Sequence, residues 1–522
     1  MISEQQSTRN PATSNKKLPE YRSQKQEPAA RNPLAREPEA SNQKLETRSQ
    51  KPEMNIEEFK KYGHEIVEWI ASYYENIRDY PVRSQVSPGE IFNKLDGAAP
   101  EEGEQMSRIL KDFEDIIMPG ITHWQSPAFH AYFPSNTSFP SLLGEMLTSA
   151  LGAQCMIWDT SPAAAELEEK VMIWLRDMIG LPESFSGVTQ DTASTATLCA
   201  LITAREKKSN FGVNSNGFFD QKPMRIYCSA ETHSSVEKAV KIMGAGNNNL
   251  VKVGVDDNQA VDIRLLRQAI RKDIEAGFQP LAVVAAIGTT GTVAIDPLKE
   301  IAAVCREFDL WLHVDAAYAG TALILEEYRW MIEGIEDVDS FVFNPHKWMF
   351  VNFDCSAYFV KDEKALSNTF SILPEYLKTN TTGKVKDYRD WSIQLGRSFR
   401  ALKLWFVIRS YGVNQMKKII REHINMAKSL AEMIREHSGF EVLTVSLNLI
   451  CFRLRPYQAE SLEEINQRNK NLMDKLNASG KIYLTHTKIG DKLVLRMVTG
   501  QTYLTEADVR RSWEVIKEAV ER

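Results

Sequence analysis

The sequence of 522 residues contains no apolar run of the roughly 18 or more residues that a membrane-spanning helix needs. Residues 1–6 have no apolar core, so we expect no signal peptide. A strong charge of one sign is also missing. The net charge of −6 at pH 7 gives no electrostatic case for nucleic acid or an anionic membrane as a partner. These absences predict a cytoplasmic protein.

Closely spaced cysteines and histidines are missing as well. The six cysteines are scattered, lie mostly in apolar runs and include no C-x-x-C pair, so we expect reduced core thiols. The nine histidines show no H-x-x-x-H or H-x-H spacing, which argues against a metal site. The remaining composition, 43% hydrophobic and 25% charged, is ordinary for a globular protein.

Residues 1–53 differ in composition from the rest of the chain. They are rich in Gln, Lys, Glu, Pro, Ser and Asn and nearly free of aromatics, which predicts a disordered polar tail. The segment also repeats itself, because Arg9-Asn10-Pro11 recurs as Arg31-Asn32-Pro33. It is either an interaction tail or a translated upstream repeat that precedes a true start at Met54, and we favour the second interpretation.

The folded part is predicted to begin near Met54 with an N-terminal helical segment, 54–138. From about residue 163 helices and strands alternate, which predicts an α/β large domain, 139–405, with a mostly parallel sheet. Residues 406–522 read as a smaller α+β domain. We expect helices over 56–77, 104–116, 139–152, 166–179, 198–207, 298–307, 414–437 and 461–478, and strands over 225–228, 281–287, 310–314, 341–343, 349–353, 440–445 and 448–454.

Lys347 stands between two apolar segments, in Phe341-Val342-Phe343-Asn344-Pro345-His346-Lys347-Trp348. A lysine in such surroundings is poorly placed to be a solvated charge, and burial lowers the pKa of an amine. Upstream, Asp315 ends a second apolar strand, where ligands of open α/β sheets bind. Asp315 could simply cap the following helix. A desolvated amine and a strand-end carboxylate are also what pyridoxal phosphate (PLP) needs from a protein.

Three further segments place small polar groups after predicted strands. Thr192, Ala193 and Ser194 precede a helix, whose free N–H groups could bind phosphate, although plain capping is the alternative. His233 lies just before Ser234–Glu237, which has the spacing of a capping box, and its imidazole could stack on a flat ring or face solvent. Thr290 lies in a Gly-Thr-Thr-Gly turn that could lie beside such a ring.

Residues 375–390 are polar and lack periodicity, which indicates a loop. Such loops are usually surface connections, but some close over a site and exclude water. Tyr388, near the end of the segment, is a candidate proton donor.

In this order the motifs resemble those of the PLP-dependent aromatic L-amino acid decarboxylases, the group II decarboxylases. The resemblance runs from Met54 to the end of the chain. Four motifs carry it: Asn344-Pro345-His346-Lys347-Trp348, Val314-Asp315-Ala316-Ala317-Tyr318-Ala319-Gly320, His130-Ala131-Tyr132-Phe133-Pro134 and Ser161-Pro162-Ala163. It implies the aspartate aminotransferase-type fold (fold type I), PLP as cofactor and a homodimer.

The resemblance also implies roles for single residues. Lys347 would bind the cofactor covalently, Asp315 would pair with its ring nitrogen, His233 would stack on its ring and Tyr388 would protonate Cα. Further cofactor contacts would come from Thr192, Ala193, Ser194, Thr290, Ala317, Asn344 and His346. The substrate pocket would be formed by Trp124, Tyr132, Phe133, Pro134 and Ser135, with Gln154 and Met156 reaching the pocket of the partner subunit.

The implied reaction is loss of CO2 from tryptophan, phenylalanine, tyrosine or DOPA to give the arylalkylamine. Family members with phenylalanine at the loop tyrosine, or asparagine at the stacking histidine, tend to be aldehyde synthases, so Tyr388 and His233 favour plain decarboxylation. Oxidative deamination and a catalytically silent PLP fold remain alternatives. The aromatic pocket motif argues against glutamate as substrate. Ser135, Gln154 and Met156 depart from many relatives, which leaves the preferred substrate open.

Overall fold

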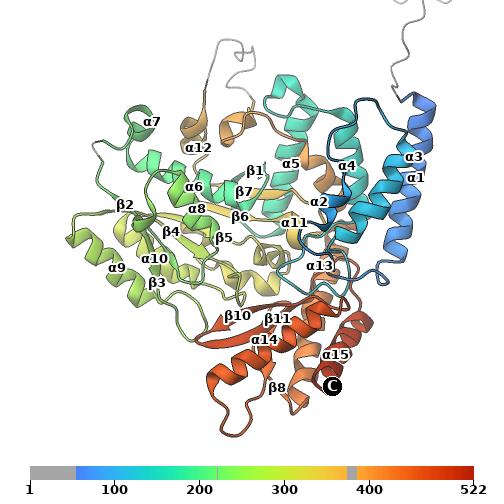
Figure 1. Cartoon of the computed structure of the whole chain (residues 1–522). Coiled ribbons are helices and arrows are strands. Elements are labelled where there is room, and N and C mark those ends of the chain that lie inside the picture. Colours follow the sequence, from blue (N-terminus) through green and yellow to red (C-terminus); the bar gives the residue numbers. More distant parts are fainter. Residues whose placement is uncertain (1–53, 220, 373–384, 522) are drawn as a thin grey trace, which may run out of the picture. The chain divides into compact units, whose positions relative to one another are not determined.

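The computed structural model describes residues 54–219, 221–372 and 385–521 (Figure 1). Its contacts divide the chain into the units Met1–Glu58 and Phe59–Arg522. The predicted tail, residues 1–53, lies outside the described residues. None of the helices in the described part of the chain is long and apolar enough to cross a membrane.

The N-terminal helices agree with the predicted ranges. Helix α1 covers Ile56–Glu75, α2 covers Glu90–Lys94 and α3 covers Met106–Asp112, and α3 continues as the π-helical turn Phe113–Ile117. None of the residues of these elements is buried. Their apolar residues therefore do not belong to the protein core.

A seven-stranded sheet forms the centre of the large domain, in the order β1-β7-β6-β5-β4-β2-β3. Strand β7 is antiparallel to both neighbours, and the remaining pairs are parallel. The predicted mostly parallel sheet is thus confirmed. The strands are β1 (Ser186–Gln190), β2 (Met224–Ser229), β3 (Leu250–Val253), β4 (Gln279–Ala286), β5 (Trp311–Asp315), β6 (Ser340–Phe343) and β7 (Ser356–Val360).

Helices cover both faces of this sheet. In β4, Val283 and Ala285 belong to one hydrophobic core and Ala282 and Val284 to another, because successive strand residues point to opposite faces. The helices of the large domain are α4 (Phe139–Leu151), α5 (Pro162–Met178), α6 (Ala193–Lys208), α7 (Gly212–Asn216), α8 (Ser235–Ile242), α9 (Ile263–Glu275), α10 (Leu298–Phe308), α11 (Pro345–Trp348) and α12 (Glu363–Phe370).

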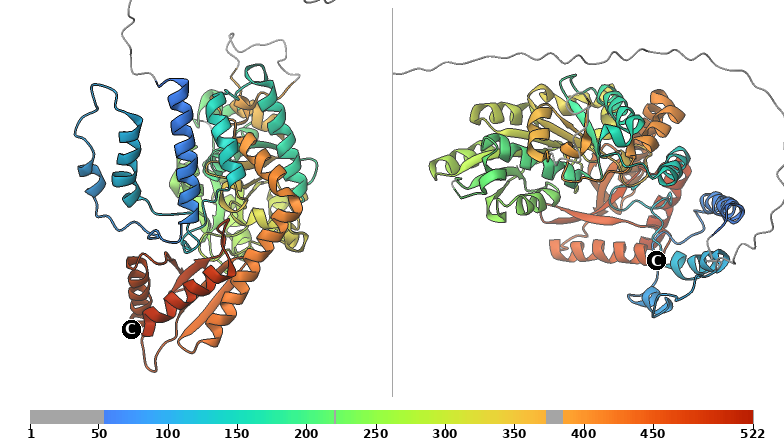
Figure 2. Two further views of the ribbon diagram at one scale, coloured as in Figure 1. Left: turned by 90° about the vertical axis from the view of Figure 1, so that its right-hand side faces the viewer. Right: turned by 90° about the horizontal axis from the view of Figure 1, so that it is seen from above.

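The long helix α13 (Arg400–Glu436) connects the large domain to the C-terminal region, as Figures 1 and 2 show. It begins 14 residues before the predicted helix, and Gly412 interrupts it with a φ of 69°. The predicted boundary at 405–406 falls within it. The C-terminal sheet has the order β10-β11-β9-β8. Its elements are β8 (Phe440–Ser446), β9 (Leu449–Leu454), β10 (Thr485–Ile489), β11 (Lys492–Val498), α14 (Leu462–Ala478) and α15 (Glu506–Glu521).

Two local predictions are wrong. Residues 349–353 are not a strand: Met349, Phe350 and Val351 are fully buried but pair with no strand, and the next strand is β7. A short apolar run does not reveal whether its burial comes from strand pairing or from packing of a loop. Ser234 does not form the predicted capping box, because its side chain makes no capping bond at α8. The reciprocal bonds between Thr505 and Asp508, in contrast, do cap α15.

The buried histidines predict that acid destabilises the fold. Complete burial lowers the pKa of His130, His313 and His423 to about 4. A histidine whose pKa is lowered on folding contributes stability above its unfolded value of about 6.5 and loses it as the pH falls towards 4. Each should remove up to about 1.4 kcal/mol of unfolding free energy per pH unit in that window.

Urea unfolding at pH 7.5, 6.0 and 5.0 measures this loss. An unfolding free energy that is constant from pH 7 to pH 4.5 would contradict the prediction.

Candidate active site

One pocket of about 240 Å³ lies where the carboxyl ends of β1, β2, β4, β5 and β6 meet. These strands run in the same direction, because β1 and β6 are both antiparallel to β7, so the turns that follow them lie at one edge of the sheet. All the predicted cofactor residues line this pocket: Thr192, Ala193, Ser194, His233, Thr290, Asp315, Ala317, Asn344, His346 and Lys347. Gly288 and Thr289, from the predicted Gly-Thr-Thr-Gly turn, also line it, as do four residues to which the sequence assigned no role in the site: Ser235, Ala286, Tyr318 and Phe353.

Lys347 projects into the pocket from α11, directly after β6. Burial lowers the pKa of its amine, and the nearby Asp315 opposes that shift. Its Nζ lies 5.4 Å from the centroid of the Phe133 ring. The surroundings therefore favour the neutral amine, the form that attacks a carbonyl carbon.

Asp315 closes β5 and is 7% exposed. Its Oδ1 accepts a hydrogen bond from the backbone N–H of Ala317 at 3.0 Å, so the local capping role is present. The carboxylate also lines the pocket, and it acts on the pKa values of both Lys347 and His233. The same side chain thus makes the capping bond and lines the pocket.

The N-terminus of α6 borders the pocket. Thr192 caps the helix, with its Oγ1 accepting from the N–H of Thr195 at 3.4 Å, and Ala193 and Ser194 form the first turn. Asn344 also lines the pocket, and its Oδ1 accepts a hydrogen bond from the hydroxyl of Ser356. A helix N-terminus with free N–H groups and a hydroxyl suits a phosphate.

His233 lines the pocket between β2 and α8. Its Nδ1 accepts a hydrogen bond from the N–H of Ser235 at 3.2 Å. Burial lowers the pKa of the ring, Lys347 lowers it further, and Asp315 opposes both effects. A neutral ring whose Nδ1 accepts carries its proton on Nε2, which leaves a flat, uncharged face for stacking.

His346 is part of the pocket wall. Burial and the neighbouring Lys347 lower its pKa to about 3. Its Nδ1 accepts from the N–H of Cys355 at 3.0 Å, and its ring packs on Phe353 with the centroids 4.7 Å apart. This histidine is neutral, and its position ties Lys347 to the segment before β7.

Of the residues predicted to bind substrate, Phe133 alone lines the pocket. Trp124 and Tyr132 stack on one another at 5.8 Å and remain exposed. Pro134 and Ser135 lie outside the pocket lining, as do Gln154 and Met156.

The structure does not bring Tyr388 to the pocket. It is 1% exposed, its ring packs against Trp391 and the Arg397 guanidinium, and its hydroxyl has no hydrogen-bond partner. The prediction that this hydroxyl protonates Cα is therefore not supported by its position. Residues 373–384, which make up most of the predicted loop, lie outside the described residues.

Arg496, on β11, is a basic residue that the sequence reasoning missed. It is 2% exposed, and its Nε and Nη1 donate to the Gly291 carbonyl and the Thr485 hydroxyl, both at 2.8 Å. Its guanidinium carbon lies 5.4 Å from the centroid of Phe133. Burial lowers its pKa, and its hydrogen bonds in the described structure go to neutral oxygens. In the sequence it is one polar residue in an apolar strand, which gives no signal.

The arrangement fits PLP group by group. It contains a buried amine whose pKa is lowered, a carboxylate on the neighbouring strand, an imidazole face and a hydroxyl-bearing helix N-terminus around one cavity. No three His, Cys, Asp or Glu side chains gather to form a metal site in the described part of the chain. Together with the sheet topology, these features define a PLP-dependent enzyme of fold type I.

Comparison with known proteins gives the family. The pyridoxal-dependent decarboxylase conserved domain matches residues 88–455, and the chain belongs to this family. It is 42% identical over 476 residues to phenylacetaldehyde synthase of Arabidopsis thaliana, covering 89% of this chain and 96% of that one. It is 41% identical over 490 residues to tyrosine decarboxylase 4 of Petroselinum crispum, covering 91% and 96%.

The structural comparison agrees. The crystal structure of Oryza sativa TDC with PLP and tryptamine superimposes with a TM-score of 0.87 at 35% identity, covering 90% of this chain and 98% of that one. The cofactor of this chain is PLP.

Proposed function

We propose that this protein is a PLP-dependent carboxy-lyase that converts an aromatic L-amino acid into the arylalkylamine and CO2. The observation that carries the proposal is the convergence of Lys347, Asp315 and His233 on one pocket from three different strands. Relatives that are 41–42% identical include a tyrosine decarboxylase, which supports an aromatic substrate.

PLP, when bound, supplies a sink for the electrons that remain at Cα as CO2 leaves. The side chains of this chain hold and tune it. Lys347 would bind it covalently through its amine, and Asp315 would keep a proton on the ring nitrogen. The ring of His233 would stack on it and exclude water. Thr192 and Ser194, with the N–H groups of the first turn of α6, would hold the phosphate.

The deciding experiment offers tryptophan, phenylalanine, tyrosine and DOPA to the purified holoenzyme. We expect the corresponding amine and one equivalent of CO2 from at least one of them, with amine identified by mass. Absence of CO2 from every substrate, with PLP bound, would favour the catalytically silent alternative.

A second candidate function is aldehyde synthesis, because phenylacetaldehyde synthase of Arabidopsis thaliana is among the similar proteins. That reaction consumes O2 and water and releases CO2, ammonia, hydrogen peroxide and the arylacetaldehyde. Assaying peroxide and aldehyde beside amine in the same reactions separates the two activities.

We also propose that Arg496 binds the substrate carboxylate. Its buried guanidinium lies against Phe133 on the pocket wall and lacks an acidic partner in the described structure. We expect Arg496→Met to raise KM about 100-fold, because a charge-assisted bond contributes up to about 3 kcal/mol. Titration of the apoenzyme should show unchanged PLP affinity. An unchanged KM would show that Arg496 does not bind the substrate carboxylate.

The position of Tyr388 predicts that its hydroxyl is dispensable. Tyr388→Phe should retain amine formation within about twofold, because an unpaired hydroxyl outside the pocket contributes no hydrogen bond to lose. Tyr376 is the other tyrosine of the predicted loop and lies outside the described residues. Loss of amine and gain of aldehyde in Tyr376→Phe, with Tyr388→Phe active, would identify Tyr376 as the donor. Loss of amine and gain of aldehyde in Tyr388→Phe, with Tyr376→Phe active, would instead identify Tyr388 as the donor.

We also propose that the enzyme is a homodimer. Helix α4 leaves a row of apolar side chains exposed at helical spacing, namely Phe139, Leu143, Met146, Leu147 and Leu151. Gln154 and Met156 follow three and five residues later, and a second copy that covers α4 would bring them towards its pocket. Light scattering of the holoenzyme should give about twice the mass of one chain, 59.3 kDa.

The cytoplasm is our proposal for the cellular location. It rests on the sequence, which has a small net charge and no apolar run long enough for a membrane-spanning helix. Imaging of a fluorescent fusion tests it. Accumulation of the fusion in an organelle would contradict it.

A further inference from the structure

Arg397 forms a buried ion pair with Glu168 of α5. Its Nη2 lies 2.6 Å from Oε1 and its Nη1 3.1 Å from Oε2 of that carboxylate, and both side chains are 2% exposed. In such surroundings a two-pronged pair tolerates little displacement, because separating the charges leaves each of them buried and unpaired.

The pair holds the end of β1, which is an edge strand. The Nη2 of Arg397 donates to the Thr189 carbonyl at 2.8 Å, and Glu168 accepts from the Thr189 N–H at 2.8 Å. Thr189 pairs with β7 on its other side, so Arg397 and Glu168 satisfy the backbone groups that an edge strand leaves free.

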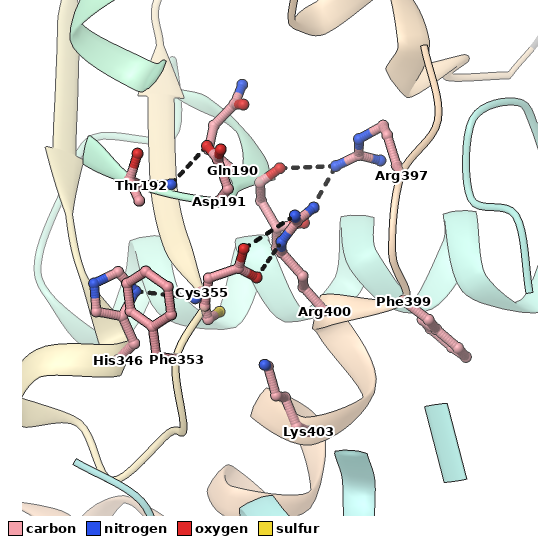
Figure 3. Close-up of polar contacts among 12 residues, drawn as sticks. Gln190, Asp191, Thr192, His346, Phe353, Cys355, Arg397, Phe399, Arg400 and Lys403 are labelled. Carbon is pink, nitrogen blue, oxygen red and sulfur yellow. Dashed lines mark hydrogen bonds and ion pairs between the residues drawn. The ribbon is translucent and has the colours of Figure 1, made fainter. Parts of the chain in front are cut away.

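The connection continues to the phosphate-binding turn. Gln190 accepts from the hydroxyl of Ser392 at 2.8 Å, and Asp191 accepts from Gln394 at 3.1 Å and from the Thr192 N–H at 2.7 Å. Figure 3 shows Asp191 beside Thr192, with Arg397 on the other side of the cluster. Each residue from Thr189 to Asp191 is therefore bound to the segment 392–397.

The same arginine also forms hydrogen bonds with the segment that contains Gln154 and Met156. Its Nη1 donates to the Cys155 carbonyl at 3.2 Å, and its own carbonyl accepts from the Cys155 N–H at 3.1 Å. Its N–H donates to the Gln154 Oε1 at 2.7 Å. The segment thus has three bonds to one residue.

We propose that Arg397 is a positioning residue that couples the phosphate-binding turn Thr192–Ser194 to the substrate-side segment Gln154–Met156. The guanidinium bonds the Thr189 carbonyl at the end of β1 and the Cys155 carbonyl of the other segment. The turn is joined to the 392–397 segment through Asp191 and Gln394. Phosphate binding at the turn therefore restrains the end of β1 and, through Arg397, the segment Gln154–Met156, and so fixes substrate preference. The inference rests on the proposed function, in which the turn holds PLP and the segment contacts an aromatic amino acid.

Arg397→Lys and Glu168→Gln test it, with Arg453→Lys as the matched control. Arg453 also forms an ion pair with a glutamate and is 6% exposed, but it lies on the C-terminal sheet with Glu441. Three quantities are measured: the PLP dissociation constant of the apoenzyme, the ratio of kcat/KM for the two best aromatic substrates, and the Tm of the apo and holo forms.

We expect Arg397→Lys to raise the PLP dissociation constant about tenfold, because lysine replaces the forked contact with a point charge. The substrate ratio should change at least about threefold, and the Tm difference between holo and apo forms should shrink. Arg453→Lys should lower both Tm values alike and leave the dissociation constant and the ratio unchanged. Gln394→Ala, which removes a contact on the phosphate side alone, should raise the dissociation constant without changing the ratio.

An Arg397→Lys enzyme with wild-type PLP affinity and substrate ratio would overturn the proposal. A raised dissociation constant with an unchanged ratio would overturn the coupling. If Arg397→Lys does not fold, Glu168→Gln decides on the same criteria. Failure of the proposed function itself is distinct, since the wild-type protein would then not bind PLP or act on any aromatic amino acid.

Discussion

Replacing Lys347 by alanine should reduce amine formation about 10⁴-fold or more, the scale seen when an enzyme loses the side chain that forms its covalent bond. Lys347 is the lysine that lines the pocket, and burial lowers the pKa of its amine, which favours the reactive neutral form. The absorbance band of the lysine-bound cofactor should also disappear. Mass detection of the amine and a visible spectrum measure both effects.

Lys403→Met is the matched control for the loss of a buried lysine. Its amine is also buried, but it pairs with Glu145 of α4 at 2.9 Å and does not line the pocket. This variant should be less stable and keep the absorbance band. Turnover that persists in Lys347→Ala would show that Lys347 is not the residue that binds the cofactor covalently.

Asp315→Asn should lower kcat about 10³-fold. An adjacent carboxylate raises the pKa of a protonated ring nitrogen by about 1 to 3 units, and asparagine cannot supply that charge. Asparagine still offers an oxygen to the N–H of Ala317, so the turn after β5 should be preserved. The variant therefore isolates the charge from the capping bond, and kcat with the absorbance of the bound cofactor reports the result.

Asp339→Asn provides the comparison. Its carboxylate is also largely buried, and it accepts from the Leu312 N–H at 2.8 Å near the start of β5, away from the pocket. We expect reduced stability with kcat retained. A kcat for Asp315→Asn within about tenfold of wild type would show that the ring nitrogen needs no carboxylate, because tenfold corresponds to about 1.4 kcal/mol.

The cofactor side of the site was predictable because each of its residues follows a strand that can be recognised by its own apolar pattern. Asp315, His233 and Lys347 each come directly after such a strand or close behind it. Parallel strands bring their carboxyl ends to one edge, so the local patterns together imply one pocket. The helix start at Thr192 was likewise visible from capping residues and small side chains.

The substrate side was not predictable in the same way. Tyr388 has the same local sequence whether it faces the pocket or packs under Arg397, and only the packing of the segment around it shows that it is buried. Arg496 lies on the C-terminal sheet and packs against Phe133, which is distant from it in the sequence. No periodicity in the sequence records a contact of that kind.

The sequence alone determined the strand-ending residues, the mostly parallel sheet and the PLP chemistry, because these depend on short-range patterns and on strand direction. Tertiary structure alone decided which polar groups are buried, which reach the pocket and which hold one another, as Arg397 does with Glu168 and Thr189. Burial and long-range contact depend on how separate segments pack, and the free energy of a charge or hydroxyl depends on those surroundings more than on its neighbours in sequence.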